Sequence, residues 1–205
     1  MTPPPRQVHL ASRNAKKLAE MERILVEHLP DVTVVGLDDV AAYAEPVEDA
    51  PTFEGNALIK ARAGLRATGL VTIADDSGLC VDALNGMPGV LSARWSGPPK
   101  SDQRNNELLL AQLADVPDER RGAHFRCAVA VCLPDGRELV VEGRMSGTVL
   151  REVRGTGGFG YDVLFEADDL PGKTTAELDP ASKDAISHRG RALRDLAPRL
   201  VDLLV

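Results

Sequence analysis

The chain has 205 residues, which is enough for one large domain or two small lobes around a sizeable core. Its formal net charge of -7 argues against nucleic-acid binding through a general positive field, so an anionic ligand would need a focused basic site. We therefore expect no nucleic-acid partner.

The cysteines and the N-terminus bear on the compartment. Cys80, Cys127 and Cys132 show no metal-ligand spacing and fit small buried hydrophobic residues in a reducing compartment. The first residues lack the apolar core of a signal peptide, and no segment approaches the length of a membrane span. We expect a soluble, cytoplasmic protein without a membrane partner, in which residues 1–6 form a flexible tail.

A predicted strand followed directly by a helix opens the chain. Residues 8–11 are a short apolar run, and residues 12–14 offer caps for a helix. The apolar positions of that helix are Leu18, Met21, Leu25 and Leu29. Arg13, Lys16 and Lys17 surround its first turn. A helix N-terminus presents free backbone N–H groups and the positive end of the helix dipole, so cations there are unfavourable unless an anion binds. The cluster therefore favours an anion site over a solvated basic turn.

The second predicted strand, residues 32–37, leads through an acidic loop into another helix. Thr52 is placed to cap this helix, which carries Asn56 and Lys60 one turn apart. Glu48 in the loop could supply an oxygen ligand to a metal, although most acidic loop residues are simply solvated.

Two adjacent carboxylates follow the next predicted strand. Residues 70–73 are typical of a short buried strand, and we expect it to end at Asp75 and Asp76, with Gly78 turning the chain. Carboxylates at the mouth of a buried strand require a metal ion, a cationic contact or strong hydrogen bonds. For the dipeptide alone, a simple turn cap is the more common interpretation.

The middle of the chain predicts a mixed sheet. Residues 86–95 form a glycine-rich loop, Ser101 caps a helix, and residues 125–133 are the longest strand candidate. A turn at 134–137 joins that strand to residues 139–141 as an antiparallel hairpin. We expect an α/β fold in which a mixed central sheet is flanked by helices.

A glycine-rich segment with aromatic residues lies at 155–162. Its four glycines, with Phe159 and Tyr161, suit close approach to a nucleobase, although a glycine-rich surface loop is the commoner explanation.

A polar trio lies near the C-terminus. Residues 179–180 begin a short helix that carries Lys183. On one regular helix, Lys183 would lie far around the axis from His188 and Arg189, so the helix must break near Ser187 if the three act together. For His188 alone, an ordinary hydrogen-bonded histidine is the more frequent case.

The chain as a whole resembles the inosine triphosphate pyrophosphatase family, which acts on non-canonical purine nucleoside triphosphates. The blocks that carry this resemblance span nearly the whole chain in the family's order, at residues 10–17, 52–57, 74–79, 92–94, 155–162 and 187–190. Each block alone is a weak signal, whereas the ordered set is specific.

The resemblance implies a Mg²⁺-dependent hydrolase that cleaves ITP, dITP or XTP between the α and β phosphorus atoms, giving the monophosphate and pyrophosphate. Such an enzyme clears deaminated purines from the nucleotide pool. The resemblance also implies an elongated fold of two lobes with the active site in the cleft between them, a single pyrophosphatase domain over residues 1–205, and a homodimer. The alternatives are a Maf-like pyrophosphatase of modified pyrimidine nucleotides and a nucleotide sensor without turnover.

The resemblance also assigns roles to residues. Asp76 matches the catalytic carboxylate, a general base that also touches the metal, and Glu48 is the second acidic metal contact. The role of Asp75 stays open between metal-adjacent and structural. The implied substrate-binding residues are Ser12, Arg13, Asn14, Ala15, Lys16 and Lys17, then Lys60 and Ser77, and finally Phe159, Gly160, Tyr161, Asp162, Lys183, His188 and Arg189.

Within this set the resemblance separates phosphate binding from base recognition. The first helix and Lys60 would hold the triphosphate, Phe159 would stack on the purine, and the polar trio would recognise the base. The chain departs from the family pattern at Arg13, where glycine is frequent, at Gly55, where glutamate is usual, and at Val163, where proline is frequent.

Overall fold

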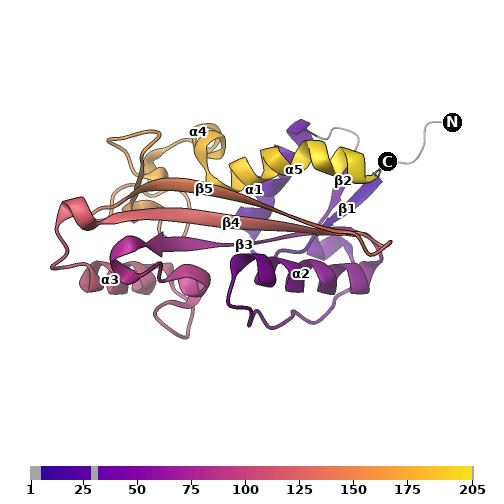
Figure 1. Cartoon of the computed structure of the whole chain (residues 1–205), viewed down its shortest axis with the longest axis horizontal. Coiled ribbons are helices and arrows are strands. Elements are labelled where there is room, and N and C mark those ends of the chain that lie inside the picture. Colours follow the sequence, from indigo (N-terminus) through magenta and orange to yellow (C-terminus); the bar gives the residue numbers. More distant parts are fainter. Residues whose placement is uncertain (1–5, 29–31, 205) are drawn as a thin grey trace. The chain divides into compact units, whose positions relative to one another are not determined.

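The computed structural model describes residues 6–28 and 32–204 (Figure 1). The predicted tail, apart from residue 6, and the predicted apolar position Leu29 lie outside these residues. In chain order, the main elements are β1 (Arg6–Leu10), α1 (Ala15–His28), β2 (Val32–Val35), α2 (Phe53–Thr68), β3 (Val71–Val81), α3 (Asp102–Gln112), β4 (Gly122–Cys132), β5 (Glu138–Val149), β6 (Phe165–Ala167), α4 (Pro180–Ile186) and α5 (His188–Leu204).

The strands form one mixed sheet in the order β2-β1-β3-β4-β5-β6. β1 pairs in parallel with both neighbours, so that Val8 lies opposite Val34 on β2 and Val71 on β3. β5 and β6 pair in the antiparallel sense. The predicted mixed α/β sheet is therefore confirmed, with the crossover helices α1 and α2 making the parallel half possible.

The chain divides into two compact units, each with its own core. Unit 1 comprises the described residues up to Asp76, together with Cys127–Gly143 and the residues from Arg189 onward; unit 2 comprises Ser77–Arg126 and Arg144–His188. In unit 1, apolar side chains of α1 and α5 pack on β1, β3 and β4. In unit 2, α3 packs on the distal ends of β3, β4 and β5, and the rings of Phe125 and Phe165 meet edge to face at 4.8 Å.

Unit 1 has helices on both faces of its part of the sheet. Figure 1 shows α1 and α5 on one side of the strands and α2 on the other. A residue on β3 can therefore face either α2 or the pair α1 and α5, depending only on its place in the alternation of the strand.

Local sequence signals account for the helix boundaries. The side chains of Thr52, Ser101 and Asp179 each accept a hydrogen bond from a backbone N–H in the first turn of α2, α3 and α4, as predicted. The predicted break near Ser187 is also present, because α4 ends at Ile186 and Ser187 has an extended backbone with ψ of 150°.

Gly55 has a steric explanation in this chain. A Cβ atom at this position would lie 2.6 Å from the Cβ of Ala50, so the acidic loop packs against the first turn of α2 where a larger residue could not fit. The glutamate usual in the family would therefore require the loop to move.

Among the helices within residues 6–28 and 32–204, none is long and apolar enough to cross a membrane.

Candidate active site

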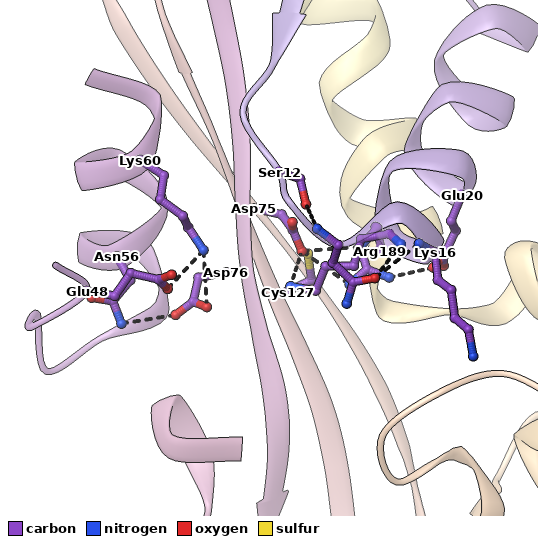
Figure 2. Close-up of polar contacts among 12 residues, drawn as sticks. Ser12, Lys16, Glu20, Glu48, Asn56, Lys60, Asp75, Asp76, Cys127 and Arg189 are labelled. Atoms are coloured by element: carbon purple, nitrogen blue, oxygen red, sulfur yellow. Dashed lines mark hydrogen bonds and ion pairs between the residues drawn. The ribbon is translucent and has the colours of Figure 1, made fainter. Parts of the chain in front are cut away.

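Asp75 and Asp76 lie within a continuous strand rather than at its end. β3 runs from Val71 to Val81, so the predicted strand end and the turn at Gly78 are wrong. Figure 2 shows the two carboxylates on opposite sides of β3, as the alternation of a strand requires. Because each carboxylate finds polar partners on its own face, neither requires the strand to stop.

Asp75 belongs to a buried ion-pair cluster on the α1 and α5 side of β3 (Figure 2). Its Oδ2 accepts hydrogen bonds from Lys17 Nζ at 3.0 Å and from Arg189 Nε and Nη2 at 3.2 and 3.1 Å. Arg189 Nη1 donates to Glu20 at 2.5 Å. The side chains of Asp75 and Arg189 are each only 1% exposed. The two carboxylates balance the two cations, which is the condition under which charges are buried.

The charges around Asp75 fix it as an anion. Burial opposes its ionisation, but the positive charges of Lys17, Arg189 and Lys60 outweigh burial and hold the pKa of Asp75 well below its usual range. Asp75 is therefore a counter-ion that is already fully engaged, which makes it a poor proton acceptor. This assigns Asp75 the structural alternative that the sequence left open.

Asp76 lies on the α2 side of β3 with fewer charged partners. Its Oδ2 accepts a hydrogen bond from Asn56 Nδ2 at 3.1 Å, and its Oδ1 lies 3.6 Å from Lys60 Nζ. Burial raises the pKa of Asp76 above its ordinary value, although Lys60, Lys17 and Asn56 partly offset this effect. Adjacent carboxylates are thus driven apart in basicity, and Asp76 is the one suited to take a proton.

Lys60 joins Asp76 to Glu48. Its Nζ donates to Glu48 Oε2 at 3.0 Å and also faces Asp76, so both predicted metal ligands approach one cation (Figure 2). Within the described residues, no cluster of three or more His, Cys, Asp or Glu side chains is suited to hold a metal alone. Two converging carboxylates fit Mg²⁺, which is usually held by one or two carboxylates together with water and substrate phosphates.

The N-terminus of α1 is capped from within. Asn14 Oδ1 accepts from the backbone N–H groups of Lys16 and Lys17 at 3.1 and 3.2 Å, and the Asn14 N–H donates to Ser12 Oγ at 3.3 Å. Part of the predicted backbone anion site is therefore occupied by Asn14. The cationic side chains of the first turn carry the remaining attraction for an anion.

Arg13 is directed to the segment after β2. Its Nη2 donates to the Tyr43 carbonyl at 3.2 Å, and its Nε lies 3.5 Å from a Glu45 oxygen. Because the side chains of this ion pair are both more than half exposed, solvent screens the attraction and an anion could compete for Arg13. Ala15, the first residue of α1, is exposed and offers its backbone alone.

In unit 2, Asp162 connects the glycine-rich loop 155–162 to α4. Asp162 Oδ2 accepts from the Phe159 N–H at 2.8 Å and from Lys183 Nζ at 2.6 Å, while its Oδ1 accepts from Thr175 Oγ1 at 2.8 Å. The Lys183 ammonium lies 4.9 Å from the centre of the Phe159 ring. Two predicted base-binding residues are thereby brought together by a third.

Two glycines of the loop are explained by packing within unit 2. A Cβ at Gly158, where φ is +69°, would lie 2.1 Å from Asp162 Oδ2, and one at Gly157 would lie 2.7 Å from the Ala176 carbonyl oxygen. These glycines therefore permit close approach to other parts of this chain, which is neither the close approach to a nucleobase nor the plain surface loop considered from the sequence.

Tyr161 is buried and does not present its ring at the surface. The Tyr161 side chain is 3% exposed in the core of unit 2, and its hydroxyl donates to the Ser92 carbonyl at 2.9 Å. Burial raises the pKa of Tyr161. Only its backbone is therefore available to line a ligand site. Ser77, the residue after Asp76 on β3, is half-buried.

The predicted trio is divided at the break between α4 and α5. Lys183 and His188 belong to unit 2, where the His188 ring stacks on Phe125 at 4.9 Å and 11°. Arg189 belongs to unit 1, in the cluster with Asp75. The sequence could not reveal the partner of Arg189, because Asp75 lies 114 residues away.

The contacts also show polar residues that the sequence interpretation missed, namely Glu20, Asp102, Asn106 and Thr175. Buried asparagines in α3 were the available signal, since Asn105 and Asn106 occupy core-facing positions of a helix.

On this mixed α/β sheet, the raised pKa of Asp76, the second acid Glu48 and the Lys60 between them are compatible with metal-assisted hydrolysis of phosphate esters or anhydrides. Comparison with known proteins gives the particular family. Residues 8–199 match the sequence model of the Ham1 family, and the chain belongs to this family. The predicted resemblance is thereby confirmed.

Relatives of high identity cover nearly the whole chain. The dITP/XTP pyrophosphatase of Nocardia farcinica is 61% identical over 200 residues, which cover 96% of each protein. That of Corynebacterium efficiens is 58% identical over 200 residues, covering 95% of this chain and 97% of the relative.

Solved structures agree with these sequence relatives. The crystal structure of the Mycobacterium abscessus nucleoside-triphosphatase / dITP/XTP pyrophosphatase matches with a TM-score of 0.76 at 56% identity, covering 94% of this chain and 99% of that chain. The Staphylococcus aureus Ham1 protein matches with a TM-score of 0.84 at 37% identity, covering 96% and 99%.

Proposed function

We propose that this chain is a pyrophosphatase of non-canonical purine nucleoside triphosphates, with dITP, ITP and XTP as substrates and the monophosphate and pyrophosphate as products. The observation that carries the proposal is the separation of the two carboxylates on β3. Asp75 is locked among cations, whereas Asp76 has raised basicity and shares Lys60 with Glu48. The names of the relatives supply the substrate class.

Asp76 is the general base of the proposed reaction. It accepts a proton from a water molecule whose oxygen forms a bond to the α-phosphorus, while the bond from that phosphorus to the bridging oxygen breaks and pyrophosphate leaves. Bound Mg²⁺, held by Asp76 and Glu48, would neutralise phosphate charge and make the water more acidic. The hydrogen bond from Asn56 keeps one oxygen of Asp76 oriented.

The phosphates are assigned to cations of unit 1. Lys60 is placed beside the acidic pair, and Lys16, Lys17 and Arg13 stand at the first turn of α1. Ser12 and Asn14 shape that turn through their mutual hydrogen bond. Lys60, Lys17 and Arg13 each also pair with a carboxylate, so a bound triphosphate would share these cations with Glu48, Asp75 and Glu45.

The base is assigned to residues of unit 2. Phe159 supplies a ring for stacking, and the buried Asp162 holds Lys183 beside it. Donors directed at a 6-keto oxygen would accept hypoxanthine and xanthine and reject the 6-amino group of adenine. A mismatched buried polar pair costs about 1–3 kcal/mol, which corresponds to a discrimination of roughly 5- to 150-fold.

A substrate panel tests this proposal. Purified protein with Mg²⁺ should release pyrophosphate from dITP and XTP far faster than from dATP, dTTP or UTP. Preference for dTTP or UTP would support the Maf-like alternative instead. Tight binding of dITP without turnover would support the nucleotide sensor.

We also propose a homodimer and Mg²⁺ as the metal, both on the strength of the family resemblance. Sedimentation should give twice the mass of 21.9 kDa. Chelation should abolish turnover, and added Mg²⁺ should restore it. A monomer that is fully active, or activity that persists after chelation, would contradict the respective proposal.

A further inference from the structure

Two residues at the start of α3 hold both peptide groups of one glycine in the 155–162 loop. The Gly160 N–H donates to Asp102 Oδ2 at 2.7 Å, and Asn106 Nδ2 donates to the Gly160 carbonyl at 2.9 Å. Asp102 and Asn106 are four residues apart, so they lie on the same face of α3. All of these groups belong to unit 2.

The two contacts restrict the backbone conformation of Gly160. Its φ of +62° lies in the left-handed region, which glycine enters freely but also leaves freely. It follows Phe159 directly, and the Phe159 N–H is itself held by Asp162. The contacts from α3 therefore restrict the backbone that carries the Phe159 ring.

Helix capping does not account for these contacts. Ser101 already caps α3 through the Arg104 N–H, so Asp102 is not required for that role. Asn106 is 7% exposed, and its Oδ1 is buried without a hydrogen-bond partner among the described residues. Burying an unsatisfied acceptor costs stability, and the hydrogen bond that Asn106 donates to Gly160 must offset that cost.

We propose that Asp102 and Asn106 are positioning residues of the base site, which set purine selectivity by fixing Gly160 and thereby both Phe159 and the nearby Asp162, which holds Lys183. This inference rests on the proposed function, because it assigns the 155–162 loop to the base. The two residues act on the nucleotide through the loop, whereas the phosphates are assigned to unit 1. Their loss should therefore weaken base recognition selectively.

Kinetics of Asn106→Ala and Asp102→Ala test the proposal. We expect KM for dITP to rise about tenfold for each variant, as for loss of one hydrogen bond, and the ratio of kcat/KM for dITP over dATP to fall by a similar factor. The inhibition constant of pyrophosphate, which reports the phosphate end alone, should stay within about twofold of wild type. Asp102→Asn retains an acceptor oxygen and should restore most of the selectivity.

The same helix offers a matched control. Gln103 and Glu107 are an exposed hydrogen-bonded pair with the same four-residue spacing, and their hydrogen bond joins them only to each other. Glu107→Ala should leave KM and selectivity unchanged. Should Asn106→Ala fail to fold, the exposed Asp102 still carries the test.

The outcomes separate this inference from the proposed function. Wild-type protein that does not cleave dITP would overturn the proposed function, and this inference with it. Active wild type with unchanged selectivity in Asp102→Ala would overturn this inference alone. An equal rise in KM for dITP and in the inhibition constant of pyrophosphate would also overturn it, because the effect would not be confined to the base.

Discussion

Asparagine substitutions at Asp75 and Asp76 should affect different properties: the first should lower stability, and the second should abolish turnover. Asp75→Asn removes the anion that neutralises Lys17 and Arg189 in a cluster where the Arg189 side chain is 1% exposed. Removing one partner of a buried ion pair costs about 3–5 kcal/mol. With a urea m-value of about 2 kcal/mol per M, the unfolding midpoint should fall by about 1.5–2.5 M. For Asp75→Asn, the loss of kcat, expressed as a free energy, should be smaller than the loss of stability.

Asp76→Asn should instead leave stability intact and remove turnover. Because burial raises the pKa of Asp76, the folded state already disfavours its charge, and an amide relieves that cost. The free energy of unfolding should change by less than about 1 kcal/mol, whereas kcat should fall by roughly 10²- to 10⁴-fold.

Urea unfolding followed by circular dichroism, together with pyrophosphate release from dITP, measures both effects on the same preparations. Unfolding of Asp75→Asn at the wild-type urea concentration would rule out the structural role of Asp75, and a near-normal kcat of Asp76→Asn would rule out its catalytic role. Exchange of the two phenotypes would mean that the structural and catalytic roles have been assigned to the wrong residues.

Three further predictions concern stability. Burial lowers the pKa of His9, so the unfolded chain takes up a proton first as pH falls and stability is lost below about pH 6.5, by up to about 1.4 kcal/mol per pH unit. His9→Gln should flatten this part of the profile in urea unfolding from pH 7.5 to 5, and an unchanged slope would contradict it. Gly55→Ala should lower the free energy of unfolding by about 1–3 kcal/mol, because the new Cβ meets Ala50, even though alanine favours a helix more than glycine does. Adding Ala50→Gly to this variant should restore the lost stability. If it does not, a clash with Ala50 is not the cause. Arg121→Met should lower the free energy of unfolding by about 3 kcal/mol or more, measured by thermal unfolding. Arg121 is 2% exposed, and its guanidinium donates to three backbone carbonyls that would lose these hydrogen bonds. A variant of wild-type stability would show that the carbonyls find other donors.

The helix boundaries could be predicted from the sequence because their causes are local. Thr52, Ser101 and Asp179 cap helices that begin one residue later. Such signals act within about four residues, so they do not depend on the rest of the fold.

The length of β3 could not be predicted, because its cause is not local. Two adjacent carboxylates look incompatible with a buried strand until their partners are known. Those partners come mainly from α1, α2 and α5, and the nearest in sequence, Lys60, is 16 residues from Asp76. Separation in sequence is also the reason why the role of Glu20, and the assignment of Lys183 and Arg189 to different units, could not be predicted.

The family blocks give candidate site residues but not what each of them contacts. Tyr161 is placed in the core of unit 2, and Asn14 satisfies backbone groups that were expected to bind an anion. A short motif specifies which side chains are present, whereas burial and hydrogen bonding depend on elements distant in sequence.

Phosphorus NMR of dITP during turnover with Mg²⁺ distinguishes cleavage between the α and β phosphorus atoms from attack at the terminal phosphorus. We expect dIMP and pyrophosphate to appear together in equal amounts, without orthophosphate. Appearance of dIDP and orthophosphate would contradict this expectation, because water would then have attacked the terminal phosphorus.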